Sequence, residues 1–252
     1  MSDFRVFCTP PSPEPTQITL SPEESHHLVI VNRARVGAPV VAFDGHGTEW
    51  QTMLTSERKN AAVLTVQTRR QIPRLPYAIT LGQALPKGAA MDAIVRKATE
   101  IGVARIVPLE SERTQVHLAG DRSDRKADKW KVAALEAAKQ CGNAFVPEVL
   151  PPQNASAFMR ESDAFDLKLI ASLQPGATSL KPVLTAFRTQ HGGEMPKRVL
   201  WLIGPEGDFS PAEMALAREC GFAPITLGPL VLRSETAAVY ALSILSYELQ
   251  NG

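Results

Sequence analysis

The sequence predicts an α/β protein in which a small β-strand domain precedes a larger domain built on a mostly parallel sheet. Three observations support this prediction. The length of 252 residues exceeds that of a typical single domain. Short strand-like segments fill residues 38–70, and beyond residue 72 apolar strands alternate with amphipathic helices. We therefore expect two domains, residues 1–72 and residues 73–252.

The first domain has the pattern of a compact barrel of short strands. The expected strands are residues 4–7, 39–43, 50–54 and 61–68. Asp44-Gly45 supplies a turn between the second and third strands. Residues 71–76 contain two prolines, which disfavour both helix and strand, so this stretch is expected to be a linker.

The second domain alternates buried strands with helices. The expected strands are residues 77–85, 103–109, 166–172, 198–203 and 224–227. Apolar residues at helical spacing predict helices that stop at Gly102 and Gly142. Ser210, Pro211 and Glu213 have the arrangement of a helix N-cap with a capping box. The segment at residues 237–249 is apolar almost all round and is expected to be a buried helix.

Two glycine-containing loops are the candidate ligand site. In an open parallel sheet, ligands bind outside the carboxyl ends of the strands. Residues 204–208 and 228–236 each follow a predicted strand, and their glycines let backbone groups approach a flat ligand such as an adenine. The alternative is that the glycines only turn the chain, and spacing alone leaves both open. Neither loop matches the dinucleotide-binding or P-loop motif.

Motifs spread along the chain resemble a known enzyme family. They include Leu202-Ile203-Gly204-Pro205-Glu206-Gly207, Leu227-Gly228-Pro229, Leu232-Arg233-Ser234-Glu235-Thr236-Ala237 and Lys97-Ala98-Thr99-Glu100-Ile101-Gly102. Together they resemble the bacterial 16S ribosomal RNA uridine N3-methyltransferases of the SPOUT superfamily. The match spans residues 4–248.

The resemblance implies both a fold and a function. It implies a PUA-like β-barrel that binds RNA, followed by a SPOUT-type parallel sheet with a C-terminal trefoil knot. It also implies a homodimer that uses S-adenosyl-L-methionine to methylate N3 of a specific uridine in 16S ribosomal RNA of the small ribosomal subunit. A non-catalytic RNA-binding factor for ribosome assembly remains an alternative. A nucleotide-dependent oxidoreductase would need a phosphate-binding glycine loop, which residues 82–88 do not provide.

The resemblance also carries over particular residues. The expected cofactor contacts are Leu202, Gly204, Gly207, Leu227, Gly228, Leu232 and Thr236. The uracil N3 proton must leave and negative charge then develops on the ring, so the reaction calls for a base and a cation. Arg233 is the candidate cation, and Glu206 and Glu235 are candidate bases. An ion pair of Arg233 with either glutamate, serving only to brace the loop, is the alternative.

RNA contacts are expected from local basic residues, because the net charge of the chain is only +1. The candidates are Arg33, Arg35, Lys87 and Arg113. The sequence departs from the family pattern at two places. Asp208 stands where a second glycine usually follows Gly207, and Asn143-Ala144-Phe145 stands where relatives generally have arginines.

Composition limits the remaining possibilities. Three widely spaced cysteines indicate neither a disulfide framework nor a zinc site, and we expect no metal. No run of 18 apolar residues occurs, and the first residues lack the pattern of a signal peptide, so we expect no membrane association and a cytoplasmic location.

Overall fold

The computed structural model describes residues 4–114 and 121–250 of the chain. These residues form two compact units. One comprises Met1–Arg74 and Leu135–Val146, and the other comprises Leu75–Ala134 and Pro147–Gly252. The smaller unit therefore includes a segment from the middle of the sequence.

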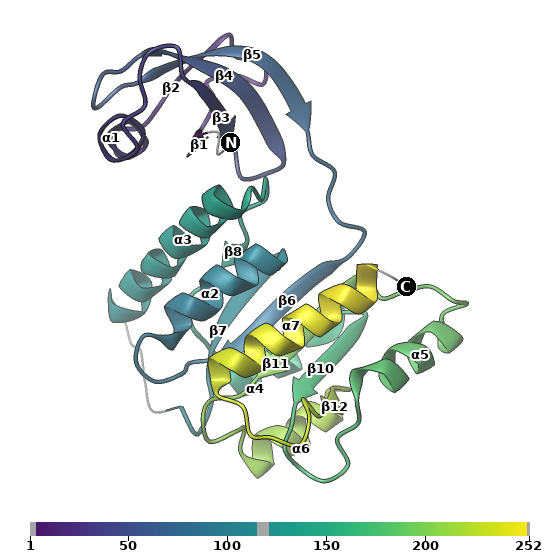
Figure 1. Ribbon diagram of the computed structural model, residues 1–252. Coiled ribbons are helices and arrows are strands. Elements are labelled where there is room, and N and C mark those ends of the chain that lie inside the picture. Colours follow the sequence, from purple (N-terminus) through teal and green to yellow (C-terminus); the bar gives the residue numbers. More distant parts are fainter. Residues whose placement is uncertain (1–3, 115–120, 251–252) are drawn as a thin grey trace. The chain divides into compact units, whose positions relative to one another are not determined.

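A curled five-stranded sheet forms the smaller unit (Figure 1). Its strands are β1 (Phe4–Phe7), β2 (Gln17–Thr19), β3 (Pro39–Phe43), β4 (Thr48–Ser56) and β5 (Val63–Gln71). Their order is β1-β3-β4-β5-β2, with β1 parallel to β3 and the other pairs antiparallel. The four predicted strands are confirmed. Strand β2 was not predicted, because three residues are too few to show an alternating pattern.

A short helical segment covers this sheet. Helix α1 (Pro22–His26) begins at Ser21, whose hydroxyl accepts a hydrogen bond from the backbone N–H of Glu24, and it continues into the π-helix η1 (His27–Val31). The carboxylate of Glu24 accepts hydrogen bonds from Lys139 Nζ at 2.9 Å and from the backbone N–H of Phe7 at 3.2 Å. This nearly buried ion pair fixes the segment at residues 135–146 within the smaller unit.

The segment that lacks the family arginines is hydrogen-bonded to the turn between β3 and β4. The backbone N–H of Gly47 donates to the carbonyl of Ala144, and that of Val146 donates to the carbonyl of Gly45. The ring of Phe145 lies so close to Gly47 that a Cβ atom there would come within 2.5 Å of it. The guanidinium of Arg74 lies over the Phe145 ring, with its carbon 4.5 Å from the ring centroid. In this chain, residues 143–146 therefore have a structural role.

The larger unit contains a seven-stranded parallel sheet. Its strands are β6 (Ala78–Ala84), β7 (Arg105–Glu110), β8 (Glu148–Val149), β9 (Gln153–Asn154), β10 (Leu167–Ala171), β11 (Arg198–Ile203) and β12 (Ala223–Ile225). The order is β12-β10-β11-β6-β7-β8, and β9 also pairs with β7. All five predicted strands are confirmed. Strands β8 and β9 were not predicted, since each has only two residues.

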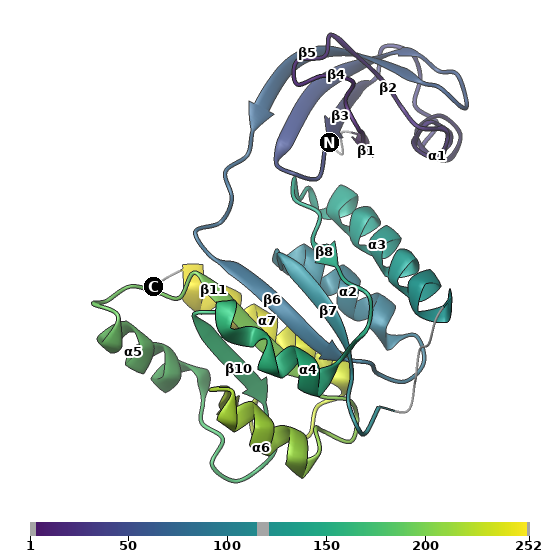
Figure 2. The same cartoon turned by 180° about the vertical axis from the view of Figure 1, so that it is seen from behind.

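Helices cover both faces of this sheet. They are α2 (Ala90–Ile101), α4 (Ala155–Arg160), α5 (Leu180–Gln190), α6 (Pro211–Glu219) and α7 (Ser234–Gln250), with the 3₁₀ turn η2 (Ser162–Ala164). Helix α3 (Asp121–Cys141) belongs to this unit up to Ala134, and its last residues belong to the smaller unit. Figures 1 and 2 show α2 and α7 on one face and α4 and α6 on the other. The predicted helix end at Gly102, with φ of +91°, and the predicted capping box at Ser210 are both confirmed.

The central strand β11 is buried on both faces and leaves little room beside it. Leu200 and Leu202 pack with residues of α4 and α6. Gly82 on β6 is required there, because a Cβ atom would overlap the side chain of Leu202. The same packing fixes the loops that leave the carboxyl ends of β6 and β11.

Helix α7 differs from the prediction on one face. Its inner residues, such as Ala238 and Leu242, are buried as expected. Tyr240 and Tyr247 are 47% and 67% exposed, so the predicted burial of this helix does not extend to this face. None of the helices in the described part of the chain has the length and apolar character needed to cross a membrane.

Candidate cofactor site

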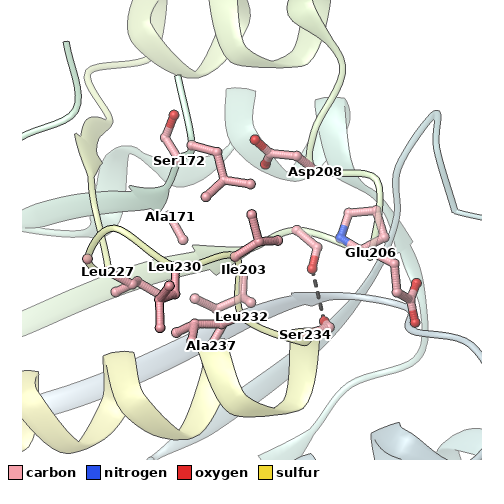
Figure 3. A pocket seen from close by; sticks show the side chains of 15 residues that line it. Ala171, Ser172, Ile203, Glu206, Asp208, Leu227, Leu230, Leu232, Ser234 and Ala237 are labelled. Atoms are coloured by element: carbon pink, nitrogen blue, oxygen red, sulfur yellow. Dashed lines mark hydrogen bonds between the residues drawn. The ribbon is translucent and has the colours of Figure 1, made fainter. Parts of the chain in front are cut away.

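A pocket of about 540 Å³, including its part open to solvent, lies at the carboxyl ends of β10 and β11 (Figure 3). Three segments line it. The first is residues 171–173 at the end of β10, and the second is residues 203–206 and Asp208 at the end of β11. The third precedes α7 and consists of Leu227, Gly228 and residues 230–232. Ser234 and Ala237 of α7 complete the wall.

The pocket wall is mainly apolar. Ile203, Leu227 and Leu232 supply aliphatic side chains, and the loops supply backbone groups. Glu206 and Asp208 are the charged residues among those that line it. In Figure 3 the side chain of Glu206 points away from the apolar side chains, whereas the carboxylate of Asp208 points toward them. The pocket thus suits a flat, largely apolar ligand that also carries polar or positive groups.

The loop at residues 204–208 is held by hydrogen bonds from three separate elements. Ser234 Oγ donates to the carbonyl of Gly204 at 3.0 Å, a bond drawn in Figure 3. The backbone N–H of Lys87 donates to Glu206 Oε1 at 2.9 Å. Arg113 Nη1 donates to the carbonyl of Gly207 at 2.7 Å. The loop is therefore shaped by residues that follow β6 and β7 and by the start of α7.

Asp208 keeps the backbone conformation that a glycine would favour. Its φ of +59° lies in the left-handed region, which aspartate tolerates better than most residues. Its backbone N–H donates to the carbonyl of Pro205 at 3.0 Å, and its Oδ1 accepts from the backbone N–H of Phe209 at 2.8 Å. The departure from the family pattern therefore adds a carboxylate to the pocket wall within a tight turn.

The start of α6 fixes the other end of this loop. Glu213 completes the capping box by accepting from the backbone N–H of Ser210 at 2.8 Å. Its other oxygen accepts from the backbone N–H of Glu112 at 3.0 Å. Since Glu213 is only 2% exposed, both bonds are shielded from water. They hold the turn that carries Arg113 against the loop after β11.

Four of the seven predicted cofactor residues line the pocket: Gly204, Leu227, Gly228 and Leu232. Leu202 is fully buried in the sheet packing. Gly207 is exposed and faces Arg113, and Thr236 is exposed on α7; neither is among the residues that line the pocket.

Sequence reasoning missed the wall formed by residues 171–173. The strand that precedes them was predicted, and parallel neighbours end at the same edge of a sheet, so this signal was available. Asp208 and Ser234 lie in the two predicted loops, but neither was expected to contact the cofactor. Ser234 was hidden because its importance depends on contacts with distant parts of the chain.

The three proposed catalytic residues differ in their surroundings. Glu206 accepts the hydrogen bond from Lys87 and so braces the loop. Arg233 is exposed just before α7, and Glu235 is partly buried in its first turn. Within residues 4–114 and 121–250, no ion pair joins Arg233 to either glutamate.

The four predicted RNA contacts fall into two pairs. Arg33 and Arg35 are exposed on the smaller unit, and Arg35 lies 3.9 Å from Glu57. Lys87 and Arg113 are exposed on the larger unit and adjoin the loop at residues 204–208. The described residues contain no group of three or more side chains placed to hold a metal ion.

Comparison with known proteins identifies the family. A family model described as an RNA methyltransferase domain matches residues 73–246, and one described as an RNA methyltransferase PUA domain matches residues 20–67. The ribosomal RNA small subunit methyltransferase E of Bacillus subtilis is 29% identical, covering 94% of this chain and 92% of that protein.

Solved structures of methyltransferases are similar to this chain along nearly its whole length. A methyltransferase from Legionella pneumophila, solved with bound S-adenosylmethionine, is 32% identical with a TM-score of 0.89, covering 98% of both chains. Ribosomal RNA small subunit methyltransferase E from Neisseria gonorrhoeae, also bound to S-adenosylmethionine, is 27% identical with a TM-score of 0.84, covering 97% of both chains. The predicted parallel-sheet fold with a PUA-like small domain is confirmed, while the knot stays a prediction. The chain belongs to the RNA methyltransferase family and is a methyltransferase.

Proposed function

We propose that this protein transfers a methyl group from S-adenosyl-L-methionine to N3 of a specific uridine in 16S ribosomal RNA of the small subunit. The single observation that carries the proposal is the pocket between the loops at residues 204–208 and 227–232. It lies where the family resemblance expects the cofactor, in a chain whose relatives are named ribosomal RNA small subunit methyltransferases.

The residues of the pocket fit this cofactor. Ile203, Leu227 and Leu232 can hold the flat adenine, and the backbone at Gly204 and Gly228 can approach its polar edge. The carboxylate of Asp208 complements a positive ligand. When bound, S-adenosylmethionine supplies a methyl group activated by its sulfonium charge.

The protein's own contribution to catalysis is positioning, charge stabilisation and removal of a proton. Arg233 stabilises the negative charge that spreads over the uracil ring as N3 loses its proton. Glu235 is the proposed base, because Glu206 already accepts a hydrogen bond from the loop after β6. Glu206 then orients the loop rather than the substrate. Holding N3 in line with the methyl group accounts for much of the rate.

RNA recognition is assigned to both units. The domain of residues 1–72 binds RNA through exposed groups that include Arg33 and Arg35. Lys87 and Arg113 contact phosphate next to the pocket, where the target uridine must enter. Residues 73–252 form the methyltransferase domain.

The protein acts as a cytoplasmic homodimer with a C-terminal trefoil knot. The exposed tyrosines of α7, Tyr240 and Tyr247, and the exposed Leu230 and Val231 support dimerisation. Aromatic and other large apolar side chains that remain exposed on a single chain are typical of subunit interfaces. Sedimentation at micromolar concentration tests this part, and a monomeric mass contradicts it.

Transfer of labelled methyl groups to ribosomal subunits tests the function. The substrates are small subunits from cells lacking this enzyme, with the free 16S RNA in parallel. We expect labelled 16S RNA in the assembled subunit and a loss of at least about a hundredfold in rate for Arg233→Ala, the scale of losing one transition-state charge contact. Binding of S-adenosylmethionine without transfer to any RNA would instead favour a non-catalytic assembly factor.

A further inference from the structure

A directed chain of hydrogen bonds connects the interior of the sheet to the cofactor loop. Gln83, near the end of β6, is fully buried. Its Nε2 donates to the carbonyl of Ala84 at 2.9 Å and to Ser234 Oγ at 3.0 Å. Ser234 Oγ in turn donates to the carbonyl of Gly204 at 3.0 Å (Figure 3). Gln83 itself is not among the residues that line the pocket.

The chemistry of the two carbonyl groups fixes the direction of this chain. The carbonyl oxygens of Ala84 and Gly204 can only accept hydrogen bonds, so each needs an N–H or O–H donor. The single hydroxyl proton of Ser234 is used for Gly204, and Ser234 must therefore accept from Gln83. Both protons of the Gln83 amide are then engaged. A residue without two donors at position 83 cannot reproduce the arrangement.

Burial of the Gln83 amide lowers the stability of the folded protein. Its Oε1 is buried and has no hydrogen-bond partner among the residues that the structure describes. A buried polar atom without a partner costs about 1–3 kcal/mol. An apolar side chain of similar shape avoids that cost, and a half-satisfied polar group is worse for a core than none. The donors of Gln83 must therefore serve something other than stability.

We infer that Gln83 is a positioning residue for the cofactor site. Through Ser234 it sets the place of the Gly204 carbonyl in the pocket wall and of the first residue of α7. Leu232 and Arg233 immediately precede that residue, so the same chain orients a cofactor contact and the proposed catalytic cation. This inference rests on the proposed function in one respect, namely that S-adenosylmethionine is the ligand of the pocket.

The opposite end of α7 provides a matched control. There Gln250 Nε2 donates to Ser246 Oγ, again at 3.0 Å, and Ser246 also lies within 3.4 Å of the Tyr77 hydroxyl. Ser246 is nearly buried, as Ser234 is. Twelve residues of helix separate the two serines, or about 18 Å. Ser246→Ala removes a hydroxyl with the same kind of partner, away from the pocket.

The test measures S-adenosylmethionine affinity by calorimetry and thermal unfolding without ligand, on the full-length protein. The variants are Gln83→Met, Ser234→Ala, their combination and Ser246→Ala. We expect Gln83→Met and Ser234→Ala each to weaken binding about tenfold, the scale of one lost hydrogen bond. The double variant should bind no more weakly than the worse single variant, because both interrupt the same chain. Ser246→Ala should keep wild-type affinity.

The unfolding temperature shows whether Gln83 positions the cofactor site or only stabilises the fold. Gln83→Met should unfold at a temperature no lower than Ser246→Ala does, although its affinity falls. Unchanged affinity in Gln83→Met, or affinity losses that simply add in the double variant, would overturn the inference. A wild-type protein that binds S-adenosylmethionine but methylates no RNA would contradict the proposed function and leave this test intact.

Discussion

Arg113 and Gly207 are joined by a hydrogen bond of 2.7 Å from the guanidinium Nη1 to the backbone carbonyl. The two residues were expected in different roles, one as an RNA contact and the other as a cofactor contact. The bond makes the basic residue part of the support for the cofactor loop. A phosphate that draws Arg113 away from Gly207 would therefore also disturb the loop.

Replacement of Arg113 by alanine should affect the cofactor as well as RNA. We expect S-adenosylmethionine affinity, measured by calorimetry without RNA, to fall about fivefold, as for loss of one charge-assisted hydrogen bond at the surface. Arg160→Ala is the control, because Arg160 also donates to a backbone carbonyl but within its own helix α4. Equal affinities for wild type and Arg113→Ala would show that the bond does not support the loop.

Substitution of Gly228 by valine should abolish cofactor binding and leave the fold intact. Gly228 lines the pocket with φ of +112°, a conformation in which a β-branched residue is strained. Calorimetry should detect no binding, while the circular dichroism spectrum stays that of the wild type. Gly193→Val is matched, since Gly193 has φ of +92° and open space around it, outside the pocket. Wild-type affinity in Gly228→Val would remove this loop from the site.

Asp208 should favour the charged methyl donor over the neutral thioether product. The variant Asp208→Asn keeps a residue that tolerates positive φ and removes only the charge. We expect the preference for S-adenosylmethionine over S-adenosylhomocysteine to drop roughly fivefold, the effect of one charge about 4 Å away in water. Asp163→Asn, at a 97% exposed side chain, controls for net charge. An unchanged preference would place the carboxylate away from the sulfonium.

The pH dependence of stability should reflect Asp166. Burial acts to raise the pKa of Asp166, but hydrogen bonds and the charge of Arg198, with the backbone N–H of Lys197, outweigh it and lower the pKa below its ordinary value. A lowered pKa in the folded state gives stability that is present above the unfolded pKa, about 3.9, and lost as pH falls through the folded pKa.

Urea unfolding of wild type and Asp166→Asn tests this dependence. The free energy of unfolding should be higher for the wild type at pH 7, and the difference should shrink as pH falls below about 4. Asp128→Asn, at an exposed side chain, should show no such trend. A difference that stays constant down to pH 3 would contradict the role assigned to Asp166.

The long apolar strands and capped helices were predictable because their signals are local. Strand β11 is a continuous buried run, and the capping box at Ser210 needs only four adjacent residues. Strands β2, β8 and β9 were missed because two or three residues carry no periodicity. The exposed face of α7 was mispredicted because its tyrosines count as apolar in a hydrophobic pattern.

The site was predictable where glycines and motifs mark it, and not where it depends on distant contacts. Gly204 and Gly228 were found from their loops. Gln83 meets Ser234 across 151 positions of sequence, so no local pattern could indicate that bond. Leu202 stays a predicted backbone contact of the cofactor, while its side chain packs in the core because it lies in the central strand.

Identification of the atom that receives the methyl group tests the proposed N3 specificity. Small subunits methylated by this protein are digested to nucleosides, and chromatography with mass spectrometry separates the isomers of methyluridine. We expect one equivalent of 3-methyluridine per 16S RNA with the wild type, and formation at least about a hundredfold slower with Arg233→Ala. Methylation at the ribose 2′-oxygen or at C5 of uracil, with no 3-methyluridine, would contradict it.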